Sequence, residues 1–152
     1  MAHVIKTLED AKALEGQEVG VSNWILVDQE RINKFADATD DHQWIHTDPE
    51  RAAREFPLGT TCAHGYLTIS LIPALIDDIV EFVGLERLIN YGINKLRFPN
   101  AVTVGSRIRA HCELVSAEEV KGSIELTEKY SVEIEGQDKP ACIAECVMRL
   151  FF

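Results

Sequence analysis

A carboxylate and an imidazole stand five positions apart in the sequence, at Asp41 and His46. They belong to the segment Asp40–His46 (DDHQWIH), a predicted loop between two helices, and loops on a rigid scaffold often carry catalytic groups. If both side chains face one pocket, they can hold a water molecule and exchange a proton with it. The alternative is that Asp40 and Asp41 only end a helix and that His46 is a packed or solvated histidine.

A second group with possible chemistry is the segment Thr60–Tyr66 (TTCAHGY), which precedes a long apolar stretch. Gly65 lies in the first turn of the helix predicted there, where backbone N–H groups have no intrahelical acceptor. Because glycine has no Cβ, a substrate carbonyl can approach its N–H closely, which favours an oxyanion site. Alternatively, Gly65 is only a tight start to the helix and His64 is a local cap.

A metal site is a further possibility, because His42 and His46 stand at i and i+4 and His64 is a possible third ligand. The H-E-x-x-H pattern is absent, and a loop between the first two histidines does not impose helical spacing. We therefore expect no metal. Ser70 does not lie in a G-x-S-x-G segment, so a serine hydrolase site has no support.

The elements around Asp41 and His46 are predicted from periodicity and capping residues. Glu18–Val27 is rich in β-branched residues with period two and predicts a strand. Asp28 is a suitable N-cap for a helix that ends near Asp40 and Asp41. The apolar face of this helix consists of Ile32, Phe35, Ala36 and Thr39. A second, short helix is expected from Asp48 as N-cap through about Arg54, with proline at its first position.

The stretch Gly65–Val83 predicts a helix that is buried on most sides, because it is apolar almost all round. Pro73 is expected to kink or restart this helix. Three acidic residues make a central core helix a better interpretation than a membrane span. These residues are Asp77, Asp78 and Glu81.

Alternating apolar residues in the last third of the chain predict half-buried antiparallel strands, preceded by a less regular strand at Leu88–Phe98. The apolar positions are Ile108, Ala110, Cys112 and Leu114, then Ile124, Leu126, Tyr130, Val132 and Ile134, and last Cys142, Ala144, Cys146, Met148, Leu150 and Phe152. A strand, helices, a long buried helix and a run of strands predict an α+β domain. Its antiparallel sheet wraps around the central helix, and residues 1–152 form one domain.

Charge and cysteine content exclude several partners and compartments. The 15 Lys and Arg against 25 Asp and Glu give a formal charge of −10, which repels nucleic acid and anionic membrane surfaces. Met1–Leu14 has no apolar or basic leader, so we expect a cytoplasmic protein. The four cysteines lack C-x-x-C spacing and are interpreted as structural thiols. They are Cys62, Cys112, Cys142 and Cys146.

Taken together, the segments Asp40–His46 and Thr60–Tyr66 resemble motifs of the MaoC-like, R-specific enoyl-CoA hydratase family of the hot dog fold. The family motif reads approximately as an aromatic residue, small residues and Gly-Asp-x-Asn-Pro-Ile-His, with an Ala/Val-His-Gly element downstream. The corresponding residues are Phe35–Thr39, Asp40–His46 and Ala63–Gly65. Asp40 replaces the motif glycine, and Gln43-Trp44 replaces Asn-Pro. The resulting Gln-Trp-Ile-His sequence resembles that of the nodulation protein N-like subgroup. The likeness extends from about Val21 to Arg109.

The resemblance implies syn addition of water to trans-2-enoyl-CoA, giving (R)-3-hydroxyacyl-CoA, and the reverse dehydration. It implies Asp41 and His46 as the catalytic pair and Gly65 as the backbone donor to the thioester oxygen. Further substrate contacts are expected at Gln43, Trp44, His64, Tyr66, Lys95 and Arg97. No cofactor is implied, because coenzyme A is part of the acyl-CoA substrate. The family's usual assembly implies a homodimer or a dimer of dimers.

An acidic protein that binds the phosphates of coenzyme A needs a local basic patch. Lys95 and Arg97 share one face of the strand at Leu88–Phe98, and Arg107 and Arg109 share another strand face. The alternative is that these are ordinary solvated strand faces.

Two other functions stay open on the sequence alone. An acyl-CoA thioesterase is possible, because the same fold hosts that activity and a carboxylate can direct water to the carbonyl carbon instead. A non-catalytic acyl-thioester-binding module is the other, because the motif is altered at Asp40 and at Gln43-Trp44. Thiol release identifies the first, and binding without turnover identifies the second.

Overall fold

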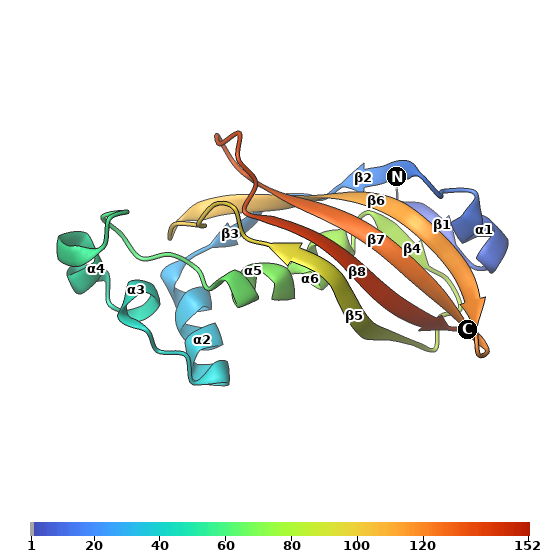
Figure 1. Ribbon diagram of the computed structural model, residues 1–152, viewed down its shortest axis with the longest axis horizontal. Helices are drawn as coiled ribbons and strands as arrows, with labels where there is room; N and C mark the ends of the chain where they lie inside the picture. The colour runs from blue at the N-terminus through green and yellow to red at the C-terminus, as the bar shows by residue number, and fades with distance from the viewer. Residues whose placement is uncertain (1) are drawn as a thin grey trace.

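A curved antiparallel sheet of six strands forms the body of the molecule (Figure 1). The computed structural model describes residues 2–152. The strand order is β2-β6-β7-β8-β5, and β3 pairs with β6. The strands are β2 (Gln17–Val21), β3 (Ile25–Val27), β5 (Arg87–Arg97), β6 (Ser106–Val120), β7 (Ser123–Ile134) and β8 (Cys142–Phe151). This architecture confirms the predicted α+β class and its antiparallel sheet.

The long strands have one face in the core and one partly exposed face, as their alternating sequence predicts. Along β6, the side chains of Ile108, Ala110, Cys112 and Leu114 are buried, and the residues between them are partly exposed. The predicted strand at Glu18–Val27 is divided into β2 and β3. The interruption contains Ser22, whose hydroxyl accepts a hydrogen bond from the Ala110 N–H.

The helical segment on the inner face of the sheet differs from the single helix predicted for Gly65–Val83. It consists of α5 (Gly65–Ser70) and α6 (Ile72–Ile76), with Pro73 in the first turn of α6. Proline has no N–H for the helical ladder, so a new helix starts there, as one of the two expected effects of Pro73. The prediction is wrong beyond Ile76. There the chain turns and forms β4 (Val80–Phe82), which pairs in parallel with β1 (His3–Ile5).

Three short helices extend beyond one end of the sheet and carry the Asp40–His46 segment (Figure 1). They are α2 (Gln29–Thr39), α3 (Trp44–Thr47) and α4 (Pro49–Glu55), and α1 (Leu8–Lys12) lies near the opposite end. The predicted caps are confirmed. The Asp28 carboxylate accepts from the Arg31 N–H at 2.9 Å, and Asp48 accepts from the Arg51 N–H at 3.0 Å. No helix in residues 2–152 is long and apolar enough to cross a bilayer.

The cysteines have no disulfide partners within the described residues, and three of them are buried. Burial raises the pKa of the Cys142 thiol to about 12 and that of Cys146 to about 11. These thiols stay protonated at neutral pH, which fits the structural role that the sequence predicts.

A carboxyl group lies in the core of the sheet, at Glu128 of β7. Its side chain is 0% exposed, and the Tyr130 hydroxyl donates a hydrogen bond to its Oε2 atom. Burial disfavours the charged form and raises the pKa of Glu128 from 4.5 to about 7. Glu128 is therefore largely protonated in the folded protein at mildly acidic pH.

The ionisation of Glu128 is expected to make the protein less stable as the pH rises. Between its ordinary pKa of 4.5 and about 7, the folded state holds a proton that the unfolded state releases. The free energy of unfolding should therefore fall by up to about 3 kcal/mol as pH rises through this range. Urea unfolding at about pH 5 and about pH 8 measures this slope, and Glu128→Gln should flatten it. An equal slope in the variant would contradict the assignment.

Candidate active site

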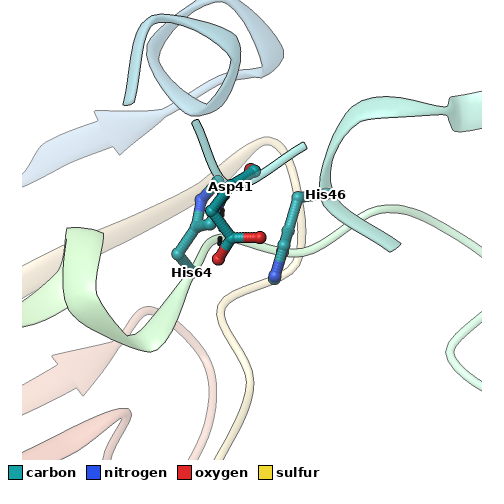
Figure 2. Close-up of side chains that lie close together, drawn as sticks. All are labelled: Asp41, His46 and His64. Carbon is teal, nitrogen blue, oxygen red and sulfur yellow. Dashed lines mark hydrogen bonds and ion pairs between the residues drawn. The ribbon is translucent and has the colours of Figure 1, made fainter. Parts of the chain in front are cut away.

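Asp41, His46 and His64 lie together at the junction between the helical extension and the sheet (Figure 2). Asp41 lies in the loop after α2, His46 lies in α3, and His64 is the residue immediately before α5. One ligand atom from each side chain lies within 4.8 Å of the others. The structure thus places Asp41 and His46 together beside the start of α5.

His46 is held in one orientation by the backbone. Its Nδ1 atom lies 2.7 Å from the carbonyl oxygen of Cys62, and the residue is 8% exposed. A carbonyl only accepts, so Nδ1 carries the proton and Nε2 has a free lone pair. Burial lowers the pKa of His46, with a smaller contribution in the same direction from His64. The neutral imidazole is therefore suited to accept a proton at Nε2.

Asp41 is the most accessible member of the cluster. Its side chain is 49% exposed, and its Oδ1 atom accepts from the Gln43 N–H at 3.4 Å. The preceding Asp40 ends α2 with a positive φ of 58°, a conformation that Asp adopts more readily than most residues. This turn directs the chain away from the α2 axis and toward His64, so that the Asp41 carboxylate faces the two imidazoles.

His64 positions the other two residues. Its ring is 2% exposed and stacks on His46 with the ring centroids 3.9 Å apart. Its Nε2–H donates to the backbone carbonyl of Asp41 at 3.0 Å. No side-chain capping bond of His64 to α5 is present. The local cap considered from the sequence is therefore not formed, and the burial and bonding of His64 indicate that it positions Asp41 and His46. A substrate contact at His64 stays a prediction.

Sequence reasoning missed two residues that hold the segment around His46. Gln29, the first residue of α2, donates from Nε2 to the His46 carbonyl at 2.7 Å. Thr61 donates from its hydroxyl to the Gln29 Oε1 atom at 2.5 Å. Neither residue stands in a recognisable motif, and only the tertiary fold brings them to His46.

Gly65 lies under an aromatic ring as well as at the start of α5. A Cβ on Gly65 would lie 2.9 Å from the Cδ2 atom of Phe98, which is too close without movement of the ring. Tyr66 is 70% exposed and meets Phe98 edge to face, with centroids 6.3 Å apart. The glycine therefore has a packing reason in addition to the backbone donor predicted from the sequence.

Gln43 and Trp44 lie on the outer side of the cluster. Gln43 is the N-cap of α3, and its carbonyl accepts from the His46 N–H at 2.9 Å. The Trp44 ring packs on Phe56, and the Arg51 guanidinium lies 4.3 Å from its centroid. Trp44 and Ile45 lie in a one-turn helix, which corrects the expected loop at these positions. Trp44 is thus fixed against α4, next to the catalytic candidates in the chain.

The basic residues divide into two groups. Arg107 and Arg109 are paired with Glu135 and Glu133, respectively, which compensates their charge. Lys95 and Arg97 are exposed on β5 and have no ion pair with any of residues 2–152. They precede Phe98, which contacts Gly65. Their charges are therefore free and lie on the strand that leads to the candidate site.

The residue types of the cluster are those of some metal sites, but their arrangement favours acid-base chemistry. The His64 nitrogen that faces Asp41 carries the proton donated to the Asp41 carbonyl. Stacked imidazoles do not direct their lone pairs to a common point, as tetrahedral coordination requires. His42, weighed as a ligand from the sequence, is exposed and lies 3.9 Å from Asp37 instead. The absence of a metal cofactor stays a prediction.

Comparisons with known proteins agree on one family. The family model described as "MaoC like domain" matches residues 10–136. A protein from Mycobacterium tuberculosis H37Rv named "3-hydroxyacyl-thioester dehydratase Z" is 49% identical over 145 residues, covering 95% of each chain. "Nodulation protein N" from Rhizobium meliloti is 42% identical, covering 93% of this chain and 89% of the relative.

A solved structure supports the fold. An (R)-hydratase from A. caviae superposes with a TM-score of 0.72 at 23% identity, covering 88% of this chain and 96% of the other. This confirms the hot dog fold expected from the sequence. With the match of the family model over most of the chain, the protein belongs to the MaoC-like dehydratase family.

Proposed function

We propose that this protein adds water to trans-2-enoyl-CoA thioesters to give (R)-3-hydroxyacyl-CoA, and catalyses the reverse dehydration. The observation that carries the proposal is the pairing of Asp41 with His46, with ligand atoms within 4.8 Å. A gap of this size suits one water molecule bonded to both groups, because each bond spans about 2.8 Å. The name of the mycobacterial relative supports a 3-hydroxyacyl thioester as the substrate class.

His46 is the proposed proton carrier of the reaction. Its neutral Nε2 accepts a proton from the water, and the water oxygen bonds to the β-carbon of the enoyl group. His46 then returns a proton to the α-carbon on the same face, which gives syn addition. Asp41 accepts a hydrogen bond from the second hydrogen of the water, which stays on the product hydroxyl, and its charge stabilises the transient imidazolium. One water is consumed, and both side chains return to their starting states.

The backbone N–H of Gly65 is the proposed donor to the thioester oxygen. As the β-carbon is attacked, negative charge moves through the α-carbon onto this oxygen. Gly65 is the first residue of α5, where an N–H has no intrahelical acceptor. A fixed donor at a developing oxyanion is worth roughly 10²–10³-fold in rate.

A cavity beside α5 offers a place for the acyl chain. It has a volume of about 550 Å³ and lies among α5, α6 and the strands β5, β7 and β8. Ile69 of α5 lines the cavity and is four residues after Gly65, or roughly 6 Å along the helix axis. We place the acyl chain here and the phosphates of coenzyme A near Lys95 and Arg97.

Crotonyl-CoA distinguishes the proposal from its alternatives in one assay. The absorbance of the enoyl thioester should fall without release of free thiol, and chiral analysis should identify the (R)-3-hydroxy product. Thiol release would instead identify a thioesterase. Tight binding of the thioester without either change would identify a non-catalytic binding module.

We also propose a homodimer formed through the edge strand β5. Every residue of this 11-residue strand except Leu96 is exposed, and β8 is its only partner strand within residues 2–152. Its exposed side chains include Ile89, Tyr91 and Ile93. A long apolar edge with unpaired backbone groups is a template for pairing with a second strand. A second copy of the chain, related by a two-fold axis, can extend the sheet across this edge.

Charged residues on the β5 edge are expected to dissociate the dimer. Sedimentation equilibrium should give twice the chain mass of 17.0 kDa for the natural protein and the monomer mass for the Ile89→Lys, Ile93→Lys variant. Leu26→Lys on β3 is the matched control, because Leu26 is equally exposed but lies away from β5. A dimer that persists in the double variant would place the interface elsewhere.

A further inference from the structure

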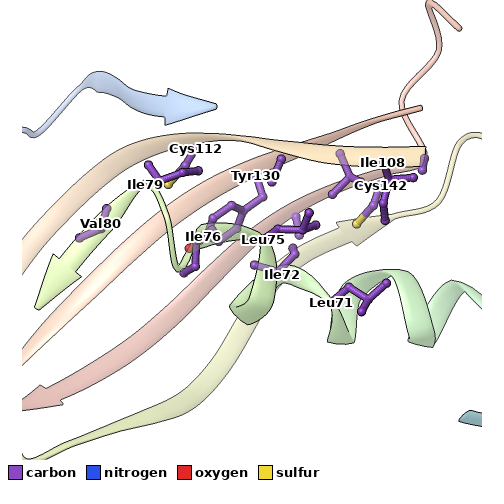
Figure 3. Packing of buried hydrophobic residues seen from close by; sticks show 14 of the residues in the cluster. Leu71, Ile72, Leu75, Ile76, Ile79, Val80, Ile108, Cys112, Tyr130 and Cys142 are labelled. Carbon is purple, nitrogen blue, oxygen red and sulfur yellow. The ribbon is translucent and has the colours of Figure 1, made fainter. Parts of the chain in front are cut away.

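The two catalytic candidates lie on the helical extension, whereas His64 is attached to the core. Asp41 follows α2 and His46 lies in α3. His64 leads directly into α5 and then α6, whose apolar side chains pack against the inner face of the sheet (Figure 3). On its other side, the buried Ala63 donates from its N–H to the Val102 carbonyl at 2.8 Å. His64 is therefore fixed to the core through both of its chain neighbours.

The His64 ring contacts each catalytic candidate with a different part of its surface. One face stacks on His46, with centroids 3.9 Å apart and ring planes at 24°. The Nε2–H donates to the Asp41 carbonyl at 3.0 Å, and Nε2 lies 4.0 Å from the Asp41 Oδ2 atom. Figure 2 shows the Asp41 carboxylate beside both rings. The two contacts are separate, so a substitution can remove one and keep the other.

Almost no surface of His64 is free for a substrate. Phe35 of α2 also packs on its ring, with centroids 4.9 Å apart and ring planes at 55°. Together these contacts leave the His64 side chain 2% exposed. His64 therefore acts on a reaction through the groups that it touches, which are Asp41 and His46.

The other ring nitrogen of His64 destabilises the fold. Its Nδ1 atom is buried and forms no hydrogen bond with any of residues 2–152. Because Nε2 carries the proton that the Asp41 carbonyl accepts, Nδ1 holds a lone pair that meets no donor. Buried polar atoms are nearly always paired, and an unpaired one is unfavourable. An apolar ring of similar size avoids this penalty, so stability alone does not account for a histidine here.

We propose that His64 is a positioning residue that sets the distance between Asp41 and His46, holding the first through its Nε2–H and the second through its ring face. Because His64 is fixed to the core, it also places both groups relative to Gly65, the next residue in the chain. This inference rests on the proposed function, in which all three groups act on one substrate. A misplacement of about 1 Å at such a site costs roughly 10²-fold in rate.

Two substitutions separate the two contacts. His64→Phe keeps an aromatic face for His46 but cannot donate to Asp41, whereas His64→Gln keeps an amide donor and loses the ring. Each should lower kcat for crotonyl-CoA hydration by roughly 10- to 100-fold and leave the dissociation constant of the unreactive butyryl-CoA unchanged in calorimetry. The unfolding midpoint of His64→Phe should not fall, because the unpaired Nδ1 is gone. In crystal structures, His64→Phe should shift Asp41, and His64→Gln should turn the ring of His46.

His42→Gln is the matched control, because His42 is exposed and lies outside the cluster, and it should keep the natural kcat. Natural kcat values in both His64 variants would overturn the inference. Weaker binding of butyryl-CoA would make His64 a substrate contact instead, and a lowered unfolding midpoint in both variants would give it a structural role only. If the natural protein does not hydrate crotonyl-CoA, the proposed function fails, and the positions of Asp41 and His46 in the variant structures still test the inference.

Discussion

Replacing Asp41 with asparagine is expected to lower kcat/KM for crotonyl-CoA hydration by about 10²–10⁴-fold while leaving the fold intact. Asparagine has nearly the same shape, but it has no charge to stabilise the imidazolium of His46. The backbone carbonyl of Asp41, which accepts from His64, is unchanged by the substitution. The Asp41 side chain is half exposed, so its neutralisation has little effect on packing.

Asp40→Asn is the matched control for this variant, since it makes the same change one residue earlier. Asn adopts the positive φ of this position as readily as Asp does. We expect nearly natural activity from Asp40→Asn, and an unchanged unfolding midpoint for both variants. Equal activities of the Asp40 and Asp41 variants would remove Asp41 from the mechanism.

Loss of the His46 imidazole is expected to lower kcat/KM by about as much as the Asp41→Asn substitution does. His46→Ala removes the proton carrier and should reduce kcat/KM by about 10²–10⁴-fold. It also leaves the Cys62 carbonyl without its donor, so part of the loss can come from local structure. His46→Asn separates the two effects, because its amide can donate to Cys62 but cannot accept a proton from water.

His42→Ala provides the control for the histidine variants. His42 is exposed and outside the cluster, so its removal should leave the rate unchanged. The Asp41→Asn, His46→Asn double variant should lose far less than the product of the two single losses, because both residues act on one water. Strict multiplication of the two effects, measured as initial rates, would indicate that they act independently.

Local signals in the sequence were sufficient for the ends of α2 and α4 and for the long strands. Asp28 and Asp48 are N-caps because a carboxylate next to an unpaired N–H is favourable whatever the tertiary fold. The alternation in β6, β7 and β8 follows from one buried and one wet face. These features depend on near neighbours in the chain, which is why the sequence predicts them.

Features that depend on tertiary contacts were harder to predict. The stretch Gly65–Val83 is apolar because both α6 and β4 are buried, and burial alone does not distinguish a helix from a strand. The role of His64 depends on the carbonyl of Asp41, which only the turn at Asp40 brings to it. Likewise, Gln29 and Thr61 support His46 across the fold and leave no pattern in the sequence.

The most direct test of the account is the position of a bound substrate in the Asp41→Asn variant. A crystal structure with trans-2-enoyl-CoA should place the thioester oxygen about 3 Å from the Gly65 nitrogen. It should also place the β-carbon opposite the gap between residue 41 and His46, with the acyl chain in the cavity beside α5. A thioester oxygen bound away from Gly65, or a β-carbon out of reach of His46, would contradict the proposed hydration.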